Sequence, residues 1–396
     1  MRRFTGNESR YVDEVLRSEF RSSKSVGMID RLERAFAQRF GMRYAISFVN
    51  GTATMHACLE AYGVGIGDEV IVSPLTMSAT TFAVLHANAT PVFADVDPAT
   101  YQISAESIEA RITDKTKAII TVSLFGLSPD MDKIMEIAAR HHLMVLEDNA
   151  ECFLGTYRDR LVGTIGHCSS FSFQSSKHIT SGEGGMVLTN DAKLADRIRK
   201  VQCLGYASVG AEKGKVLKRD IQDPNYFRHV SMGWNYRMSE LCAAVALGQL
   251  ENIDMLVHCR IRAAELFSDA IEGCDWLVPQ LVPPECTHAY WTWAVSLKHP
   301  KISWYEFRDK FVELGGDGIY AAWQLSYREP MFQSKNLLGR ERLINPERLL
   351  EYGSIDLCPV AERLQPRLLQ FKTSYWDEAV ALRQAEILRE TVRALG

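Results

Sequence analysis

The sequence predicts an α/β protein: a large domain with a mainly parallel, mixed sheet covered by helices, followed by a smaller α+β C-terminal domain. Between about residues 40 and 190, short apolar runs rich in β-branched residues alternate with segments that carry apolar residues at helical spacing. This alternation is typical of parallel strands joined by helices. The chain of 396 residues also exceeds the roughly 250–300 residues at which one hydrophobic core stops growing, so a second domain is expected.

The first forty residues are predicted to be helical. Five continuously apolar segments then predict strands that are buried on both faces. These strands are expected at residues 44–49, 69–74, 90–96, 117–125 and 143–148, with helices at 52–64, 78–88, 104–112 and 130–142. A further strand, "SSFSFQ", is indicated at 169–174 by its alternating pattern. The sequence contains no common metal-binding motif, because the histidines form no HExxH pattern and the nine cysteines form no CxxC pair.

The second half is less regular. A helix is predicted at 191–205, and residues 206–229 form a polar stretch without a period, which in a compact protein is either disordered or functional. One long helix is predicted at 238–271, and it bridges to the second domain. We therefore divide the chain into residues 1–255, a large domain with the N-terminal helices, and 256–396, a small domain containing a strand at 290–297 and helices at 303–315 and 376–395.

The charge pattern argues against nucleic acid or an anionic membrane as a partner. The net charge is −4, and no block of five or six like charges occurs. No segment approaches 18 uninterrupted apolar residues, and the N-terminus has no apolar core typical of a signal peptide. The prediction is a cytoplasmic protein with reduced thiols, no metal and small molecules or proteins as partners.

Three features place chemistry at one end of the predicted sheet. Asp148 ends a strand, and ligands collect at the carboxyl ends of parallel strands. Gly51 lies where a strand turns into a helix, and this turn can present N–H groups to a phosphate. Lys177 lies between hydroxyl residues and the glycines Gly182, Gly184 and Gly185. Lysine can condense with a carbonyl, as in pyridoxal enzymes, where an acid pairs with the pyridine nitrogen. Taken singly, the same residues are also compatible with a surface lysine and a helix cap.

Five blocks in order resemble one family. They are "NGTATMHACLEAYGVGIGDEVIVSPLTMSATTFAVLHANATPVFADVD", "LEDNAECFLGTY", "LVGTIGHCSSFSFQSSKHITSGEGGMVLTND", "GWNYRMSELCAAVALGQLE" and "CPVAERL". The chain resembles the DegT/DnrJ/EryC1/StrS sugar aminotransferases, which are pyridoxal phosphate enzymes of fold type I. The resemblance implies an aspartate aminotransferase-like large domain and a homodimer with shared active sites.

The resemblance also implies roles for individual residues. Lys177 would form the Schiff base with pyridoxal 5'-phosphate and act as general acid/base, and Asp148 would keep the pyridine nitrogen protonated. Glu151 would approach the ring hydroxyl; many members have Gln there, and Glu resembles the perosamine-synthase branch. The remaining implied cofactor contacts are Gly51, Thr52, Ala53 and Ser172 for the phosphate, Met77 on the ring, and Asn235 from the neighbouring subunit.

Each of these roles has a plainer alternative. Ser172 could be a polar strand position, Asn235 a turn former and Glu151 a helix cap. Met77 replaces a residue that is often aromatic in the family, although a thioether can also pack on a ring. Thr54 replaces a commoner alanine, which we interpret as neutral. The segment "GGDGIYAAWQLSYREPMF" resembles the family only loosely, and substrate choice should lie there.

The implied activity is transfer of an amino group from an amino acid, by resemblance L-glutamate, to a keto-sugar, expected to be nucleotide-linked, in amino-sugar and polysaccharide biosynthesis. Three alternatives stay open: an aminocyclitol (scyllo-inosose-type) aminotransferase, a pyridoxal phosphate-dependent sugar dehydratase, which Lys177 disfavours because those relatives have histidine there, and a non-catalytic regulatory relative. Candidate substrate contacts are Tyr206, Lys215, Lys218, Arg219, Tyr226, Arg228, His229, His288 and Tyr320.

Overall fold

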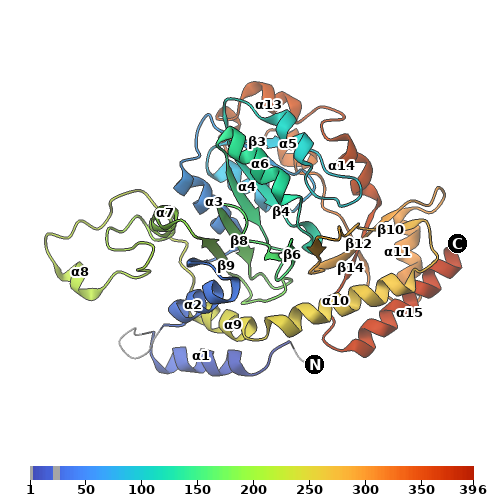
Figure 1. Ribbon diagram of the computed structural model, residues 1–396, viewed down its shortest axis with the longest axis horizontal. Helices are drawn as coiled ribbons and strands as arrows, with labels where there is room; N and C mark the ends of the chain where they lie inside the picture. The colour runs from blue at the N-terminus through green and yellow to red at the C-terminus, as the bar shows by residue number, and fades with distance from the viewer. Residues whose placement is uncertain (1–2, 21–26) are drawn as a thin grey trace.

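The computed structural model describes residues 3–20 and 27–396. Its centre is a seven-stranded sheet in the order β1-β9-β8-β5-β4-β2-β3 (Figure 1). The strands are β1 (Tyr44–Phe48), β2 (Glu69–Val72), β3 (Thr90–Phe93), β4 (Thr116–Val122), β5 (Met144–Asp148), β8 (Cys168–Ser172) and β9 (Gly185–Thr189). Within this sheet, β9 pairs antiparallel with both of its neighbours and every other pairing is parallel. The predicted α/β class with a mainly parallel, mixed sheet is confirmed.

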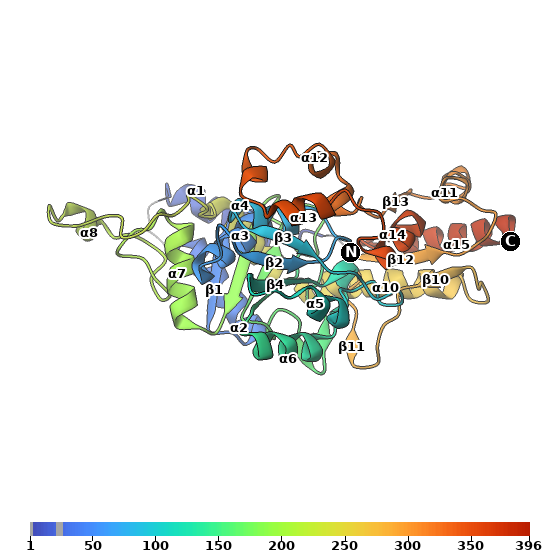
Figure 2. The ribbon, with the colours of Figure 1, turned by 90° about the horizontal axis from the view of Figure 1, so that it is seen from above.

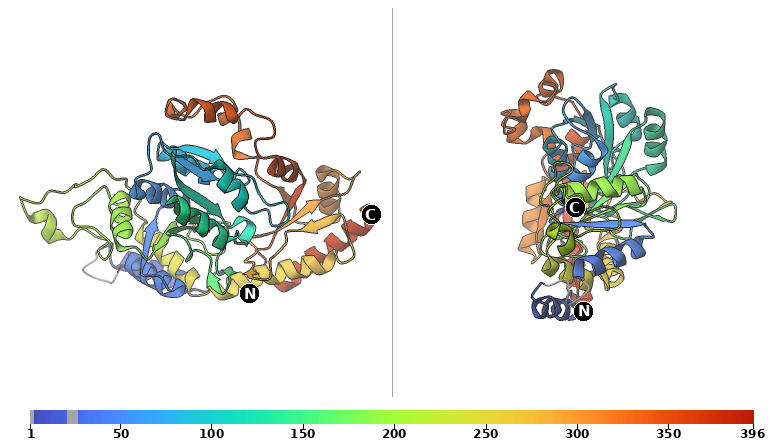
Figure 3. Two further views of the ribbon diagram at one scale, coloured as in Figure 1. Left: turned by 45° about the horizontal axis from the view of Figure 1, so that its top comes forward. Right: turned by 90° about the vertical axis from the view of Figure 1, so that its left-hand side faces the viewer.

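Helices cover both faces of this sheet (Figure 3). Strand residues alternate between two cores: Val70 and Val72 face one, and Ile71 faces the other. One face carries α3 (Gly51–Tyr62), α4 (Ala79–His86) and α7 (Ala192–Gln202), and the other carries α2 (Met28–Phe40), α5 (Ala105–Arg111), α6 (Met131–His141) and α9 (Glu240–Leu250). Because both faces are buried, the strands can be continuously apolar, as the sequence indicated.

The predicted helix 238–271 is two helices, and this is a correction. Helix α9 ends at Leu250, and α10 (Ile253–Ala270) begins after a break at Glu251 and Asn252. Asn252 has φ −115° and ψ 15°, and its side-chain amide donates a hydrogen bond of 3.0 Å to the carbonyl of Gly248. Asparagine competes with the helix backbone in this way, which apolar periodicity alone does not reveal.

A second, antiparallel sheet has the order β10-β12-β14-β13. Its strands are β10 (Leu277–Pro279), β12 (Thr292–Leu297), β13 (Ile319–Ala321) and β14 (Leu368–Lys372). Helices α10, α11 (Trp304–Glu313) and α15 (Glu378–Leu395) pack against it. The segment 325–364, with α12 (Pro330–Gln333), α13 (Pro346–Glu351) and α14 (Pro359–Leu364), instead buries Tyr327, Phe332 and Tyr352 in the core of the large sheet. The division of the chain after residue 255 stays a prediction.

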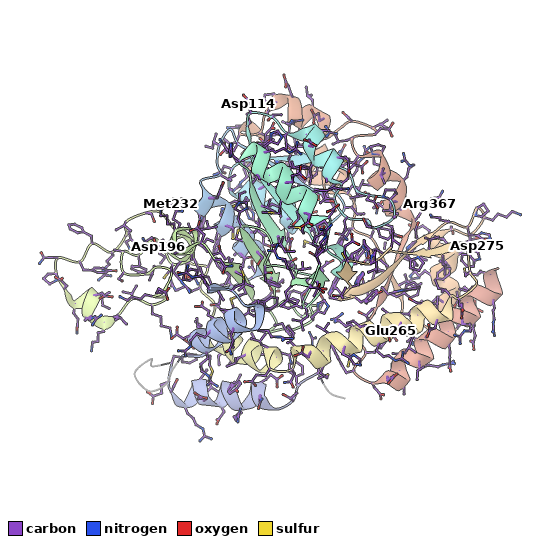
Figure 4. All side chains as sticks on the ribbon, viewed as in Figure 1. Asp114, Asp196, Met232, Glu265, Asp275 and Arg367 are labelled. Atoms are coloured by element: carbon purple, nitrogen blue, oxygen red, sulfur yellow. The ribbon has the colours of Figure 1, made fainter. Side chains whose placement is uncertain are left out.

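A projecting segment, here called the arm (residues 206–232), leaves the large domain on the left of Figures 1 and 2. Its one helix is α8 (Lys218–Gln222), and Phe227 and Met232 are 85% and 80% exposed. Met232, which is labelled in Figure 4, lies near the base of the arm. The remaining α-helix is α1 (Asn7–Arg17), and β6 (Thr156–Tyr157), β7 (Arg160–Leu161) and β11 (Cys286–Thr287) form a small third sheet. Within the described ranges, no helix is long and apolar enough to cross a membrane.

Candidate active site

A cavity of about 590 Å³ opens at the carboxyl ends of the central strands. Val122, Asp148 and Ser172, the last residues of β4, β5 and β8, line it. Seven of the predicted cofactor contacts are among its lining residues: Gly51, Thr52, Met77, Asp148, Glu151, Ser172 and Lys177. The cavity therefore lies where ligands collect in open α/β sheets.

Lys177 lies in the Lys177 loop, residues 173–184, which joins β8 to β9. Its Nζ is 3.4 Å from Oε1 of Glu151 and 4.1 Å from the centroid of the Trp291 ring. The side chains of Lys177 and Glu151 are 12% and 5% exposed, so the pair is largely shielded from water. The amine thus faces the cavity between a carboxylate and an aromatic face.

Asp148 lies at the floor of the cavity, and Glu151 three residues further on. Thr80 Oγ1 donates a hydrogen bond of 2.8 Å to Asp148, and the N–H of Ala150 donates one of 3.1 Å. The N–H of Phe125 donates one of 3.0 Å to Glu151. Burial raises the pKa of both carboxyl groups, and the positive charge of Lys177 opposes this. Two buried acids beside one lysine are costly unless a ligand uses them.

The opposite wall is the N-terminus of α3. Asn50 caps this helix by accepting a hydrogen bond of 2.8 Å from the N–H of Ala53. The N–H groups of Gly51 and Thr52 lie in the first turn, where no carbonyl of the same helix can reach them. A Cβ added to Gly51 would lie 3.0 Å from Cβ of Ser172, which is tighter than an ordinary contact, so glycine eases the close approach of the helix start to this strand end. A helix N-terminus and a hydroxyl form a cradle suited to a phosphate.

These groups fit pyridoxal phosphate: an amine for its aldehyde, a buried acid for its ring nitrogen, and donors for its phosphate. Comparison with known proteins decides the matter, because the model of the DegT/DnrJ/EryC1/StrS aminotransferase family matches residues 3–352. The chain belongs to this family. It is an aminotransferase, its cofactor is pyridoxal phosphate, and the predicted fold type I is confirmed.

Individual relatives agree with the family assignment. The chain is 39% identical over 287 residues to a GDP-perosamine synthase of Escherichia coli O157:H7, covering 72% of this chain and 74% of that protein. It is 36% identical over 273 residues to an L-glutamine:2-deoxy-scyllo-inosose aminotransferase of Streptomyces lividus, covering 69% and 63%. The crystal structure of an aminotransferase from Psychrobacter cryohalolentis has 32% identity and a TM-score of 0.82, covering 96% of each chain.

Two predicted cofactor contacts of this aminotransferase lie outside the cavity. Ala53 is 6% exposed and belongs to the buried side of α3, so its N–H serves the Asn50 cap. Asn235 is exposed, pairs in an isolated bridge with Cys203 and is not among the residues that line the cavity. Met77 does line the cavity and is 48% exposed.

The predicted substrate contacts are dispersed. Tyr320 lines a second cavity of about 500 Å³, which adjoins the first because Ser176, Trp291 and Trp323 line both. Tyr206 and Arg228 line a separate cavity of about 450 Å³ between the arm and α2. His229 lies against Tyr206, with ring centroids 4.8 Å apart. The single chain therefore does not bring the arm residues to Lys177.

His288 is placed away from every one of these cavities. Its side chain is 6% exposed, its Nε2 is 3.0 Å from Oε1 of Gln280, and its Nδ1 accepts a hydrogen bond of 2.8 Å from the N–H of Tyr290. Burial lowers its pKa to about 3, so the ring is neutral at ordinary pH. Both ring nitrogens are occupied by the protein, which is a structural arrangement, and nothing here supports a substrate contact.

Sequence reasoning missed three residues of the site. Thr80 binds Asp148 from α4, and Trp291 and Trp323 stack in parallel with centroids 5.6 Å apart at the mouth. The aromatic run "AYWTWAV" was the available signal for Trp291, although its pattern first indicates a strand.

Proposed function

We propose that this aminotransferase moves the amino group of L-glutamate to the keto group of a nucleotide-linked sugar. The observation that carries the proposal is the convergence of Lys177, Glu151 and Asp148 on one cavity beneath the N-terminus of α3. The similarity to a GDP-perosamine synthase supports a nucleotide-linked acceptor. With such an acceptor, the enzyme would act in amino-sugar and polysaccharide biosynthesis.

Each residue has a defined task in this proposal. When bound, pyridoxal phosphate supplies a conjugated ring that accepts the electron pair left by the donor's α-proton. Asp148 holds a proton on the ring nitrogen, and its burial strengthens that interaction. Gly51, Thr52 and Ser172 would hold its phosphate, Met77 would pack on its ring, and Glu151 would lie on the side of its ring hydroxyl. Lys177 would anchor the cofactor through Nζ, and the same Nζ would hold or release a proton as general acid/base.

A second copy of the chain completes the site in this proposal. Asn235, Tyr206 and Arg228 do not line the cavity that holds Lys177 in their own chain, and in this proposal they serve a neighbouring one. A twofold dimer makes such an exchange reciprocal. The exposed Phe227 and Met232 supply apolar surface for the contact.

A free aminocyclitol ketone is the alternative acceptor. The similarity to an aminotransferase for 2-deoxy-scyllo-inosose favours it, and that relative is named for L-glutamine as donor. A dehydratase is disfavoured because Lys177 is present. These acceptors differ in one testable way: a site for a nucleotide-linked sugar is inhibited by the nucleoside diphosphate alone, whereas a site for an aminocyclitol ketone is not.

The first test is an absorption spectrum of the purified protein with pyridoxal phosphate, before and after L-glutamate is added without an acceptor. We expect a visible band that moves to shorter wavelength, and no such change in Lys177→Ala. Amino transfer in that variant should fall by about 10²–10⁴-fold or more, the usual contribution of a positioned acid/base group. A fully active Lys177→Ala would refute the mechanism. Acceptor screening with GDP- and other nucleotide-linked keto-sugars, and with scyllo-inosose, then identifies the second substrate.

A further inference from the structure

Three consecutive carbonyl groups of the Lys177 loop are hydrogen-bonded by side chains from outside the large sheet. Arg3 donates 2.8 Å hydrogen bonds to the carbonyls of Ser175 and Lys177. Arg260 donates to the carbonyl of Ser176 at 2.8 Å and to that of Lys177 at 3.2 Å. The backbone that carries the reactive lysine is therefore bound on its outer side by two guanidinium groups.

Trp291 contacts the same loop in two ways. Its Nε1 donates a hydrogen bond of 3.0 Å to the carbonyl of Ser176, and its ring face lies 4.1 Å from Lys177 Nζ. Arg260 in turn donates to the carbonyl of Trp291 at 2.8 Å and to Oγ1 of Thr373 at 3.2 Å. One arginine of α10 thus joins the Lys177 loop to the start of β12 and the end of β14.

Burying Arg260 costs free energy that a purely structural role does not explain. It is 2% exposed, and among the described residues neither Arg3 nor Arg260 forms an ion pair with a carboxylate. Burial, together with the charge of Arg3, lowers the pKa of Arg260 to about 9. Apolar side chains usually stabilise a core at least as well as buried charge, so a retained buried arginine suggests a requirement for geometry. Its planar fork suits several carbonyls at fixed angles.

We propose that Arg260, with Arg3 and Trp291, is a positioning residue that fixes the Lys177 loop, so that Nζ is held between Glu151 and the Trp291 ring. The proposal rests on the proposed function, since it takes Lys177 as the residue that anchors the cofactor. Removing the donors leaves Lys177 chemically intact but lets its backbone move. A misplaced reactive group loses much of the advantage of proximity.

The test uses the full-length protein with four substitutions. Arg260→Met removes the guanidinium group, and Arg260→Lys keeps the charge with fewer fixed donors. Arg3→Gln removes the second guanidinium group, and Trp291→Phe keeps an aromatic face but loses the Nε1 hydrogen bond. Arg262→Met is the matched control, because Arg262 lies two residues further along α10 and pairs at the surface with Glu265 and Glu378. Arg3→Gln and Trp291→Phe keep the test decisive where Arg260→Met does not fold.

The first readout is hydrogen exchange of residues 173–184 in the cofactor-free protein. We expect exchange at least about tenfold faster in Arg260→Met, smaller increases in Arg3→Gln and Trp291→Phe, partial recovery in Arg260→Lys and no change in Arg262→Met. The second readout is the rate at which added pyridoxal phosphate produces the visible band, and this rate should fall in the same order. In steady-state kinetics with L-glutamate, kcat should decrease by a larger factor than the factor by which KM changes.

Unchanged loop exchange and unchanged cofactor capture in Arg3→Gln and Trp291→Phe would overturn the proposal. Faster hydrogen exchange of the loop with an unchanged rate of band formation would also overturn it, because the loop would then not position the Lys177 amine. The proposed function fails separately, if the unsubstituted protein forms no visible band with pyridoxal phosphate. The exchange data, which need no cofactor, still decide in that case whether these side chains fix the loop.

Discussion

At the scale of single residues, the site is built around two buried carboxyl groups, Asp148 and Glu151, which are 5% and 4% exposed. Each of their oxygens accepts one hydrogen bond from the protein. Burial raises the pKa of both groups, and such shifts cluster at functional sites.

The burial of the Asp148 carboxyl group has a measurable effect on the stability of the fold. Because the pKa of Asp148 is raised, the folded, cofactor-free protein holds its proton at pH values where the unfolded chain, with a carboxyl pKa near 4, has lost it. Stability is then lost as pH rises through the window from about 4 up to the raised pKa. Asparagine cannot ionise, so the stability of Asp148→Asn relative to the unsubstituted protein should rise between pH 4 and 7, as measured by urea unfolding.

Asp130→Asn provides a control with the opposite sign. Partial burial raises the pKa of Asp130, but hydrogen bonds from Tyr157 and Lys133 outweigh it, and the net shift is downward. The relative stability of Asp130→Asn should therefore fall as pH rises toward about 4 from below, and should change little between pH 4 and 7. A difference between Asp148→Asn and the unsubstituted protein that does not vary with pH would contradict the prediction.

The sequence was sufficient to place residues that local context marks out, while their roles stay predictions. Lys177 lies among small residues, Asp148 ends a strand, and Gly51 opens a helix, and all three line the cavity. Thr80 and Arg260 could not be found in this way. Their partners Asp148 and Lys177 lie 68 and 83 positions away in the chain, and only the folded sheet brings each pair together.

At the scale of elements, the carboxyl ends of β4, β5 and β8 and the start of α3 create the site. The predicted strands lie within a few residues of the observed ones, because continuous apolar runs define buried strands well. The break between α9 and α10 was missed, since both helices present apolar residues and only the side chain of Asn252 interrupts them.

The close approach of α3 to β8 yields a prediction for Gly51→Ala. The added methyl group would lie 3.0 Å from Cβ of Ser172, so helix start and strand end must separate. We expect at least about tenfold weaker binding of pyridoxal phosphate, equivalent to about 1.4 kcal/mol, from equilibrium titration of the visible band. Gly65→Ala is the control, because its added methyl group meets no atom within 4 Å. Equal affinity in both variants would mean that the phosphate does not use this cradle.

At the scale of the whole molecule, the chain presents its arm outward instead of closing its own site. Side chains alternate along residues 234–236: Trp234 Nε1 donates a hydrogen bond of 2.8 Å to Glu60 on α3, and the hydroxyl of Tyr236 is 3.1 Å from Nδ1 of His56 on the same helix. Asn235, between them, is exposed. Which arm residues are exposed could not be read from the sequence, because the 206–229 segment has no periodicity to orient it.

The final prediction is that two inactive variants complement each other when mixed. Lys177→Ala lacks the reactive amine, and Asn235→Asp would bring a carboxylate near the cofactor phosphate of the neighbouring site. In a mixed dimer one site has the intact Lys177 of one chain and the intact Asn235 of the other. Random exchange of subunits makes half of the dimers mixed, each with one good site, so about one quarter of the original specific activity should return. Unfolding and refolding the two variants together, with each refolded alone as the control, measures this. No recovery despite mixed dimers confirmed by native mass spectrometry would show that Asn235 does not serve the neighbouring site, and that each chain completes its own.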